Sequence, residues 1–436
     1  MSYHQKLLQK ITNKSAKIAI AGLGYVGLPL AKSIHDAGFK DLIGIDTNKQ
    51  RVKDLNSCNS PLASISDNEL EAMKKDGWKA VSTFQELSQA DILIICVPTP
   101  LTKSYEPDLS FIELTIESAK PHIHSGMFLC LESTTYPGTT REIFSPIMEQ
   151  LKLKVGKDVF IGYAPEREDP GNKEFSLQNT RRVVSGLTKN CLEICYNLYS
   201  KISPNPFRVT STETAEITKL LENIQRSVNI GLVNEMKMIA DRMDLNIFEI
   251  IEAASTKPFG FTKYLPGPGI GGHCIPVDPF YLTWKAKQFG INTRFIELAG
   301  QINNLTIDFV ISKIIDVLNR QSKSVRNSKL LILGLSYKKD IADLRESPNL
   351  QILTKLINLG AKVNYNDPFF PTIPDTRKVS VKLSSITLTQ KSISSHDIVI
   401  MLTNHSFYDL GMIYKSAKSI VDTRGVFKLT KKVTYA

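Results

Sequence analysis

The chain has 436 residues, 42% of them hydrophobic and 22% charged, which is the composition of a globular protein rather than a disordered or fibrous one. So long a chain exceeds one ordinary hydrophobic core and predicts two or three packed domains. The net charge of +11 favours acidic partners, but the basic residues are spread along the sequence. Because a nucleic-acid-binding protein needs a dense basic stripe, we expect no nucleic-acid partner, whereas a small polyanion would use only a few of these charges.

The N-terminus lacks an apolar run long enough for a signal peptide, and no later segment reaches about 18 consecutive apolar residues. We therefore expect a cytoplasmic protein that does not enter a membrane. The six cysteines are too few and too scattered for a disulfide framework. Cys191 and Cys195 lie one helical turn apart without a second pair or a nearby histidine, so we expect buried helix residues and no metal site.

The first elements form a strand–turn–helix–strand unit over residues 17–46, after a polar and helical lead-in. Its helix is expected near Val26–Ala37. Apolar runs typical of buried parallel strands follow at Ile92–Val97, Met127–Leu131 and Val159–Tyr163, with helical patterns between them. This alternation predicts a doubly wound α/β domain that ends near residue 205.

A long helix is predicted next, because the sequence from Thr212 to about Asp244 contains no proline and a single glycine. Its apolar residues recur at helical spacing. They are Ile217, Leu220, Leu221, Ile224, Val228, Leu232, Met236, Ile239 and Met243. Such a helix suits a connector between domains, and its apolar stripe is either intrachain core or a dimerisation surface.

A second, shorter α/β pattern begins with a strand at 329–335, followed by a helix near Leu350–Leu359 and further strands within 362–367, 397–403 and 419–425. The chain is thus predicted to be an α/β protein with two Rossmann-like doubly wound domains joined by a helical central domain. We expect an N-terminal dinucleotide-binding domain over 1–210, a central helical domain over 211–320 and a C-terminal Rossmann-like domain over 321–436.

The first strand runs into Gly22-Leu23-Gly24-Tyr25-Val26-Gly27, which matches G-x-G-x-x-G between a strand and a helix, where this motif binds dinucleotides. The first glycine allows the tight turn, the second lets the backbone approach the pyrophosphate, and the third lets the helix pack against the strand. Asp46 ends the second strand, where a carboxylate accepts ribose hydroxyls and repels a 2′-phosphate. The sequence therefore predicts that the N-terminal domain binds NAD rather than NADP.

The second α/β unit has Gly334 after its first strand but no G-x-G-x-x-G motif, so we expect no second dinucleotide there. Its loop carries Tyr337-Lys338-Lys339-Asp340 and then Asp343–Ser347, which concentrates cations at the carboxyl end of a strand. Such a loop suits a phosphate-bearing ligand, although exposed loop charges would give the same pattern.

The segment from Pro266 to Asp278 places Cys274 in a glycine-rich stretch with an acid four residues later. Such a loop lets a substrate approach the sulfur, and its N–H groups can stabilise a thiolate or an oxyanion. Lys219 and Asn223 share one face of the long helix and are suited to bind a developing alkoxide. Taken alone, Cys274 could instead be an inert buried cysteine, and Lys219 could be a solvated lysine on the helix surface. Together with a hydride-accepting cofactor, the candidate thiolate favours oxidation of an alcohol or aldehyde through a covalent intermediate.

Nine short motifs occur in order along the chain. They are GLGYVGLP at 22–29, VPTP at 97–100, EST at 132–134, APER at 164–167, KLLEN at 219–223, GGHCIPVDP at 271–279, YKKD at 337–340, RESP at 345–348 and DTRG at 422–425. In this combination the whole chain resembles the UDP-glucose/GDP-mannose dehydrogenase family. The TKPFGF loop at 256–261 resembles the branch that oxidises UDP-N-acetylglucosamine in bacterial surface-polysaccharide pathways, for O-antigen or capsule.

The resemblance implies that Cys274 captures a C6 aldehyde as a thiohemiacetal, which is oxidised to a thioester and hydrolysed, with two NAD consumed per sugar. The implied catalytic residues are Cys274, Lys219, Asn223, Asp278, Thr134 and Glu166. The implied cofactor contacts are Gly22, Gly24, Tyr25, Val26, Gly27, Asp46, Arg51, Pro98, Thr99, Ser133, Thr134 and Arg345. The implied nucleotide-sugar contacts are Glu166, Arg167, Lys219, Asn223, Lys257, Tyr264, Gly271, Lys338 and Arg424.

The substrate that this resemblance favours is a UDP-N-acetylhexosamine, and UDP-N-acetylglucosamine in particular. The same chemistry on UDP-N-acetylmannosamine, UDP-N-acetylgalactosamine, UDP-glucose or GDP-mannose is the nearest alternative, because contacts worth ~1–3 kcal/mol separate such sugars. A two-electron hydroxy-acid-type dehydrogenase without covalent catalysis is an alternative of another class, and it would not need Cys274. We also expect a homodimer or higher homo-oligomer through the 212–244 helix.

Overall fold

The computed structural model describes residues 1–62, 64–102, 104, 106–167, 179–272, 275–374 and 381–436. The chain forms two compact units. The first comprises Met1–Glu222 and Phe280–Ile291, and the second comprises Asn223–Pro279 and Asn292–Ala436. None of the helices in the described part of the chain is both long enough and apolar enough to cross a membrane.

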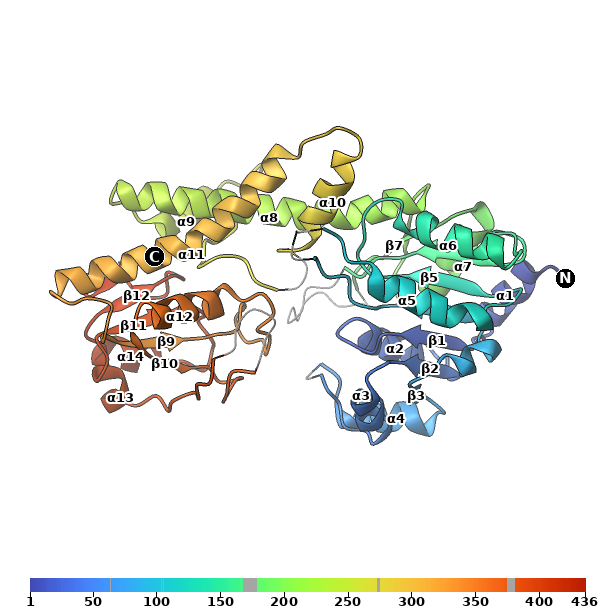
Figure 1. Ribbon diagram of the computed structural model, residues 1–436, viewed down its shortest axis with the longest axis horizontal. Coiled ribbons are helices and arrows are strands. Elements are labelled where there is room, and N and C mark those ends of the chain that lie inside the picture. Colours follow the sequence, from blue (N-terminus) through green and yellow to red (C-terminus); the bar gives the residue numbers. More distant parts are fainter. Residues whose placement is uncertain (63, 103, 105, 168–178, 273–274, 375–380) are drawn as a thin grey trace. The chain divides into compact units, whose positions relative to one another are not determined.

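The first unit contains an eight-stranded sheet (Figure 1). Its strands are β1 (Ile18–Ala21), β2 (Leu42–Ile45), β3 (Lys79–Val81), β4 (Ile92–Ile95), β5 (Phe128–Leu131), β6 (Phe160–Tyr163), β7 (Val183–Gly186) and β8 (Phe207–Arg208). They are arranged in the order β3-β2-β1-β4-β5-β6-β7-β8, and all neighbours are parallel except β6 and β7. The order of the first six strands is that of a Rossmann domain, which confirms the predicted fold.

Helices cover both faces of this sheet. One face packs on α1 (Tyr3–Thr12), α2 (Gly27–Asp36), α4 (Asp67–Lys75) and α7 (Lys189–Tyr199). The other face packs on α5 (Ser110–Ala119) and α6 (Thr139–Gln150). The helix α3 (Lys49–Asn56) and two 3-10 turns, η1 (Gln85–Gln89) and η2 (Lys120–His122), lie in the connections. Because successive strand side chains point to opposite faces, this double coverage explains why the strands were continuous apolar runs in the sequence.

The second unit contains a five-stranded, all-parallel sheet. Its strands are β9 (Lys329–Leu333), β10 (Lys362–Asn366), β11 (Ile398–Met401), β12 (Ile420–Asp422) and β13 (Val433–Tyr435), in the order β10-β9-β11-β12-β13. This is the other common doubly wound order. The helices α11 (Arg294–Arg320) and α12 (Pro348–Asn358) cover one face, and α13 (Gln390–Ser394) and α14 (Leu410–Ser416) cover the other.

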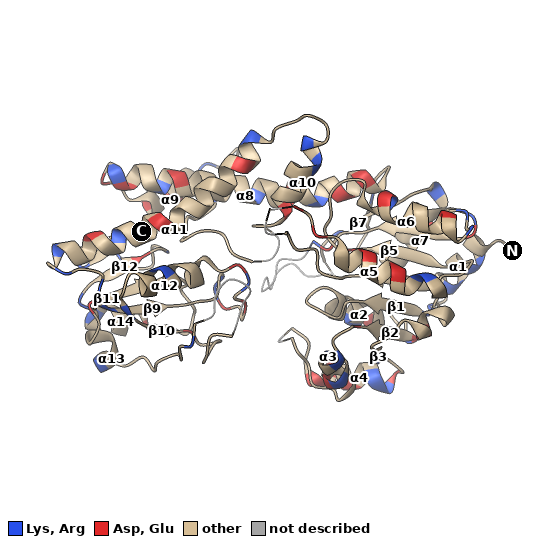
Figure 2. Ribbon diagram, in the orientation of Figure 1, with Lys and Arg blue, Asp and Glu red and all other residues tan. Residues whose placement is uncertain are grey.

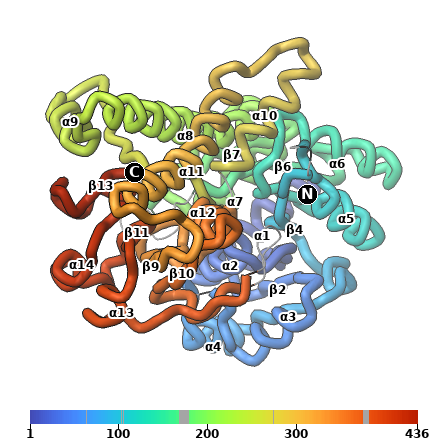
Figure 3. Tube along the Cα trace, turned by 60° about the vertical axis from the view of Figure 1, so that its left-hand side comes forward, coloured from blue at the N-terminus to red at the C-terminus, as the bar shows by residue number. Residues whose placement is uncertain are grey.

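The two units share the long helix α8 (Thr212–Arg242), whose 31 residues run without interruption (Figures 1 and 3). The shorter helices α9 (Ile247–Ser255) and α10 (Asp278–Lys287) follow it. Figure 2 shows Lys and Arg interspersed with Asp and Glu along the helices of each unit, as expected from the even spread of basic residues in the sequence.

The predicted elements and the observed ones differ mainly at their ends. The strand predicted at Ile92–Val97 stops at Ile95, and the helix predicted to reach Asp244 stops at Arg242. The last strand of the first sheet is formed by Phe207 and Arg208, which pair with β7, close to the expected end of the first α/β domain near residue 205. The division into three domains, 1–210, 211–320 and 321–436, stays a prediction.

The prediction that Cys191 and Cys195 are buried helix residues is confirmed, because both are buried in α7.

Candidate functional site

The predicted glycine loop lies between β1 and β4, where the strand order of the first sheet reverses and where doubly wound folds bind ligands. Gly22 has a φ of +91°, and a Cβ there would lie 2.7 Å from the carbonyl oxygen of Cys96. A Cβ on Gly27 would lie 1.9 Å from the carbonyl oxygen of Gly22. A Cβ on Gly24, by contrast, would meet no atom of the described residues within 4 Å. Gly24 therefore leaves open space at the start of α2, as a bound pyrophosphate requires.

Asp46 follows β2 directly and is held in place by three donors. Its Oδ2 accepts the Leu23 N–H at 3.0 Å and the Arg51 guanidinium at 3.1 Å, and its Oδ1 accepts the Asn48 N–H at 2.9 Å. The carboxylate is thus fixed beside the glycine loop with Arg51, and both residues fit the adenosine side of NAD. Tyr25 and Val26 lie in the same loop, with Tyr25 half-exposed.

The VPTP and EST motifs meet at the carboxyl ends of the adjacent strands β4 and β5. The Ser133 hydroxyl donates to the Val97 carbonyl at 2.7 Å. Pro98 is exposed, Thr99 is buried, and Thr134 is half-buried beside Ser133. The structure thus brings these four predicted cofactor contacts to the same sheet edge as the glycine loop.

A buried ion pair, which the sequence did not indicate, supports this edge. The Arg182 guanidinium donates to the Glu132 carboxylate at 2.8 Å and to the carbonyls of Ala164 and Pro165 at 3.4 and 3.2 Å. The Tyr199 hydroxyl also donates to Glu132. Arg182 therefore ties the EST motif to the APER motif. No sequence signal distinguishes it from the neighbouring Arg181, because only its burial and its partners do so.

The predicted catalytic residues of α8 lie on a buried face of that helix. Lys219 is 5% exposed, and its Nζ lies 3.9 Å from a carboxylate oxygen of Glu166. One turn further on, the Asn223 side-chain amide donates to the Asp278 carboxylate at 2.5 Å, and both residues are buried. Two pairs predicted from distant parts of the sequence are thus in contact. Cys274 lies outside the described residues.

The helix α8 is partly inverted relative to an ordinary surface helix, because its buried face carries many polar residues beside apolar ones such as Leu220 and Val233, and its exposed face carries several large apolar residues. The buried polar residues, each at most 5% exposed, are Thr212, Glu216, Lys219, Asn223, Ser227, Asn234 and Lys237. The exposed apolar residues, from 38% to 63% exposed, are Ile217, Leu221, Leu232, Met236, Ile239 and, just beyond the helix, Met243. Of the predicted stripe only Leu220 and Ile224 are buried. The stripe is therefore mainly exposed surface rather than intrachain core.

Three of the predicted sugar-binding residues make other contacts. The Arg167 guanidinium binds both carboxylate oxygens of Glu222, with Nε at 3.2 Å and Nη2 at 2.6 Å. The Tyr264 hydroxyl donates to Gln225 at 2.9 Å, and the exposed Lys257 stacks its ammonium on the ring of Phe259. Arg167 and Tyr264 thus hold their segments against α8.

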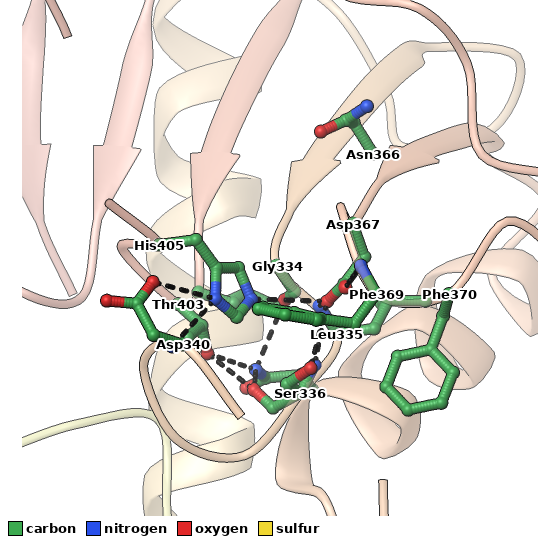
Figure 4. Close-up of polar contacts among 12 residues, drawn as sticks. Gly334, Leu335, Ser336, Asp340, Asn366, Asp367, Phe369, Phe370, Thr403 and His405 are labelled. Atoms are coloured by element: carbon green, nitrogen blue, oxygen red, sulfur yellow. Dashed lines mark hydrogen bonds and ion pairs between the residues drawn. The ribbon is translucent and has the colours of Figure 1, made fainter. Parts of the chain in front are cut away.

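The second sheet has a comparable glycine and acid at the point where its strand order reverses. Figure 4 shows the polar contacts there, around Gly334, Asp367 and His405. A Cβ on Gly334 would lie 2.4 Å from the carbonyl oxygen of Thr403, and Asp367, which follows β10, accepts the Leu335 N–H at 2.7 Å. Here, however, the same carboxylate oxygen also accepts from Ser336 and from His405.

Burial raises the pKa of Asp367, but the hydrogen bonds from His405, Ser336 and Phe369 outweigh burial and lower the pKa to about 2. Its acceptor sites are therefore occupied by the chain itself. That the second unit binds no dinucleotide in the manner of the first stays a prediction.

The predicted ligand-binding cations of the second unit are Arg345, predicted to contact NAD, and Lys338 and Arg424, predicted to contact the nucleotide sugar. The Arg345 guanidinium forms a bidentate ion pair with Asp343. The backbone carbonyl of Arg345 accepts the Gly272 N–H at 2.9 Å. The Arg424 Nε donates to the Leu402 carbonyl at 2.6 Å, and burial lowers the pKa of Arg424 to about 10. Lys338 is half-buried. Gly271 packs so closely on Tyr337 that a Cβ would lie 2.4 Å from the Tyr337 Cβ.

Comparison with known proteins covers almost the whole chain. The UDP-glucose/GDP-mannose dehydrogenase family matches with its NAD binding domain at residues 16–203, its central domain at 213–305 and its UDP binding domain at 331–429. Protein CapL of Staphylococcus aureus is 34% identical over 417 residues, which cover 94% of this chain and 96% of CapL. The UDP-N-acetyl-D-glucosamine 6-dehydrogenase of Salmonella typhi is 32% identical over 391 residues, which cover 89% and 90%.

Among solved structures, UDP-D-ManNAc dehydrogenase from Pyrococcus horikoshii matches with a TM-score of 0.86 at 29% identity, over 96% of this chain and 98% of that one.

Proposed function

The chain belongs to the UDP-glucose/GDP-mannose dehydrogenase family and is an NAD-dependent nucleotide-sugar dehydrogenase, and we propose that it oxidises the C6 hydroxymethyl group of UDP-N-acetylglucosamine to a carboxylate. The observation that carries this proposal is the buried polar face of α8, where Lys219 contacts Glu166 and Asn223 contacts Asp278. A helix face that buries these groups is suited to stabilise an oxyanion and to position a water molecule, because removal from bulk solvent strengthens each electrostatic contact.

The proposed reaction removes two hydrides from C6, the first together with loss of the hydroxyl proton; NAD, which the glycine loop and Asp46 would hold, would supply the hydride acceptor. After the first transfer, the Cys274 thiolate adds to the aldehyde carbon, so that a C–S bond forms and the carbonyl oxygen becomes an oxyanion. Lys219 stabilises this oxyanion with its ammonium group. The second hydride leaves the same carbon and gives a thioester. Water then attacks, the C–S bond breaks, and the carboxylate and the free thiol are released.

Asp278 is the group proposed to take up the proton of the attacking water, together with Glu166. The Asn223 amide orients the Asp278 carboxylate through its 2.5 Å hydrogen bond. Thr134 lies beside Ser133 at the edge where the nicotinamide end of NAD is expected. In the second unit, Lys338 and Arg424 are proposed to bind the diphosphate, because arginine and lysine are suited to phosphate oxygens.

The choice of sugar rests on the TKPFGF loop and on the relatives. The relative from Salmonella typhi is named for UDP-N-acetyl-D-glucosamine, and the structure from Pyrococcus horikoshii is named for UDP-D-ManNAc. We favour UDP-N-acetylglucosamine, with UDP-N-acetylmannosamine as the second candidate and surface-polysaccharide precursors as the product class.

The experiment is incubation of the purified protein with NAD and a panel of nucleotide sugars, with NADH followed by absorbance and the product by mass. The expected result is two NADH per UDP-N-acetylglucosamine and a C6 carboxylate. Cys274→Ala should abolish acid formation, whereas Cys58→Ala, which removes a half-buried free thiol of the first unit, should not. One NADH per sugar without acid, or full activity of Cys274→Ala, would contradict the covalent mechanism. The same stoichiometry on another sugar would overturn only the substrate.

The exposed apolar face of α8 is the basis of a second part of the proposal, that the protein is a homodimer through this helix. Exposed stripes of this size mark interaction surfaces in soluble proteins.

A further inference from the structure

The loop Pro266–Gly272 of the second unit, which contains four glycines, ends two residues before Cys274. One of its residues, Gly267, is held at both of its backbone polar groups by side chains of α8. Its N–H donates to the Asn234 side-chain oxygen at 3.0 Å, and its carbonyl accepts from the Lys237 ammonium at 3.0 Å. Asn234 and Lys237 are fully buried, at 0% and 2% exposure, and stand three residues apart on the helix. They therefore grip one peptide segment from one helix face.

The opposite side of Gly267 packs on Arg424. A Cβ on Gly267 would lie 2.8 Å from the Arg424 Nη1, so that any larger residue there would displace the guanidinium. The loop is anchored again at its end, where the Gly272 N–H donates to the Arg345 carbonyl at 2.9 Å. From the sequence alone, the role predicted for these glycines was to let a substrate approach the sulfur. In the structure, Gly267 lets the loop pack against a cation that is proposed to bind the substrate.

The two cations beside Gly267, Lys237 and Arg424, each interact with one carboxylate, Asp241 and Asp422 respectively. Burial and the nearby Arg424 lower the pKa of Lys237 to about 7, while Asp241 raises it. Asp241 is itself paired with Lys313 on α11 at 2.7 Å, and the Lys237 ammonium also lies over the ring of Phe309. A buried cation is costly, and an apolar side chain would pack on Phe309 at no such cost. With Lys313, three cations therefore stand against the two carboxylates Asp241 and Asp422, and this excess favours an anionic ligand at this loop.

We propose that Asn234 and Lys237 are positioning residues that clamp Gly267, and that this clamp sets the position of Arg424 and of the loop leading to Cys274 for binding of the nucleotide-sugar diphosphate. The identity of the ligand rests on the proposed function, whereas the clamp does not. Neither residue belongs to the predicted catalytic or binding sets.

The first test measures the clamp without substrate, by backbone hydrogen exchange with mass spectrometry of peptides that cover residues 264–272. Lys237→Met and Asn234→Ala each remove one bond to Gly267. Lys313→Met is the matched control, because it removes a lysine from the neighbouring helix without touching Gly267. We expect exchange of this loop to be at least about tenfold faster in the first two variants and unchanged in the control. Unchanged exchange in both clamp variants would overturn the proposal.

The second test measures KM and kcat with the nucleotide sugar that the wild type oxidises. In Lys237→Met we expect KM for that sugar to rise about tenfold or more, while KM for NAD stays within about twofold. A loss of general stability would move both constants together, and that result would overturn a specific positioning role.

Between pH 6 and pH 8.5 the wild-type KM for the sugar should rise as Lys237 loses its proton, and the variant should lack this dependence. Asn234→Ala provides the same comparison if Lys237→Met fails to fold.

The two proposals fail separately. Faster exchange in both clamp variants, together with a wild type that oxidises no nucleotide sugar, would sustain the clamp and overturn the proposed function. A wild type that oxidises its sugar, with Lys237→Met indistinguishable from Lys313→Met in KM, would sustain the function and overturn the clamp.

Discussion

At the scale of single residues, Glu216 shows how the buried face of α8 is held. Its carboxylate accepts the N–H groups of Gly138 and Thr140 at 2.6 and 2.8 Å and the Thr140 hydroxyl at 2.6 Å. These donors lie at the start of α6, where Gly138 is the N-cap residue and has no side chain to cap the helix itself. Glu216 therefore caps α6 from outside, three residues before Lys219.

Glu216 should make stability depend on pH with a sign that is unusual for a carboxylate. Burial raises its pKa to about 7 from an ordinary value of 4.5, in spite of its three donors. Between these two values the folded protein binds more protons than the unfolded chain, so the free energy of unfolding should fall as pH rises from 4.5 to 7. Glu216→Gln removes this titration. Urea unfolding should show the stability of wild type relative to Glu216→Gln decreasing across this window, by a few kcal/mol at most.

Glu213 provides the control for Glu216, because it lies one turn earlier and pairs with Arg141, and its pKa is lowered. Removing it by Glu213→Gln should remove a contribution of the opposite sign, one that is lost as pH falls. Identical pH profiles for the wild type and Glu216→Gln would show that the carboxylate does not titrate in this range.

At the scale of elements, the ion pair of Arg182 and Glu132 joins β5, the segment after β6 and the start of β7. Both side chains are almost completely buried. Arg182→Met would leave the Glu132 carboxylate buried without its cation, and such a change typically costs about 3–5 kcal/mol. We expect a loss of this size in the free energy of unfolding. The exposed neighbour Arg181, changed to Met, should cost less than about 1 kcal/mol.

A double variant separates the pair from the packing around it. Because Arg182→Met with Glu132→Gln removes both charges, it should recover part of the stability lost in Arg182→Met alone. A double variant that is less stable than the sum of the two single changes would contradict this account.

The elements that the sequence predicted well are those with one dominant signal. The strands β1, β4, β5 and β6 were predicted because burial on both faces requires continuous apolar residues, and their ends were misplaced by only one or two positions. The strands β7 and β8 were missed, because β8 has only two residues and β7, with the sequence VVSG, has only two large apolar residues. The length of α8 was predicted, but its orientation was left open, since an apolar stripe does not state which face is buried.

The predicted site residues were found through motifs, and the residues that hold them were not. Asn234 and Lys237 are residue types that usually lie on the exposed side of a helix, and only their contacts with Gly267 show that they are buried. Arg182 and Glu216 are missed for the same reason. Long-range contacts of polar side chains leave no local pattern in one sequence, which is why the supporting shell could not be derived.

At the scale of the whole molecule, the partly inverted helix α8 leads to the last prediction. Six apolar side chains on its outer face are exposed at spacings of three, four and more residues along one stripe. A twofold dimer would place the same stripe of a second copy against it, because a self-complementary patch satisfies both chains at once. Light scattering should therefore give a mass of two 48.7 kDa chains for the wild type.

Leu221→Asp with Leu232→Asp should shift this equilibrium to the monomer, because each change would bury a charge at the centre of the contact. Leu114→Asp is the matched control: this leucine of α5 is 66% exposed, and it lies outside the stripe. The control should stay dimeric and active. Because Lys219 and Asn223 lie on the opposite face of the same helix, loss of the partner should also lower kcat in the double variant. A wild type that scatters as a stable monomer at assay concentration would show that the apolar face of α8 is not covered by a second copy.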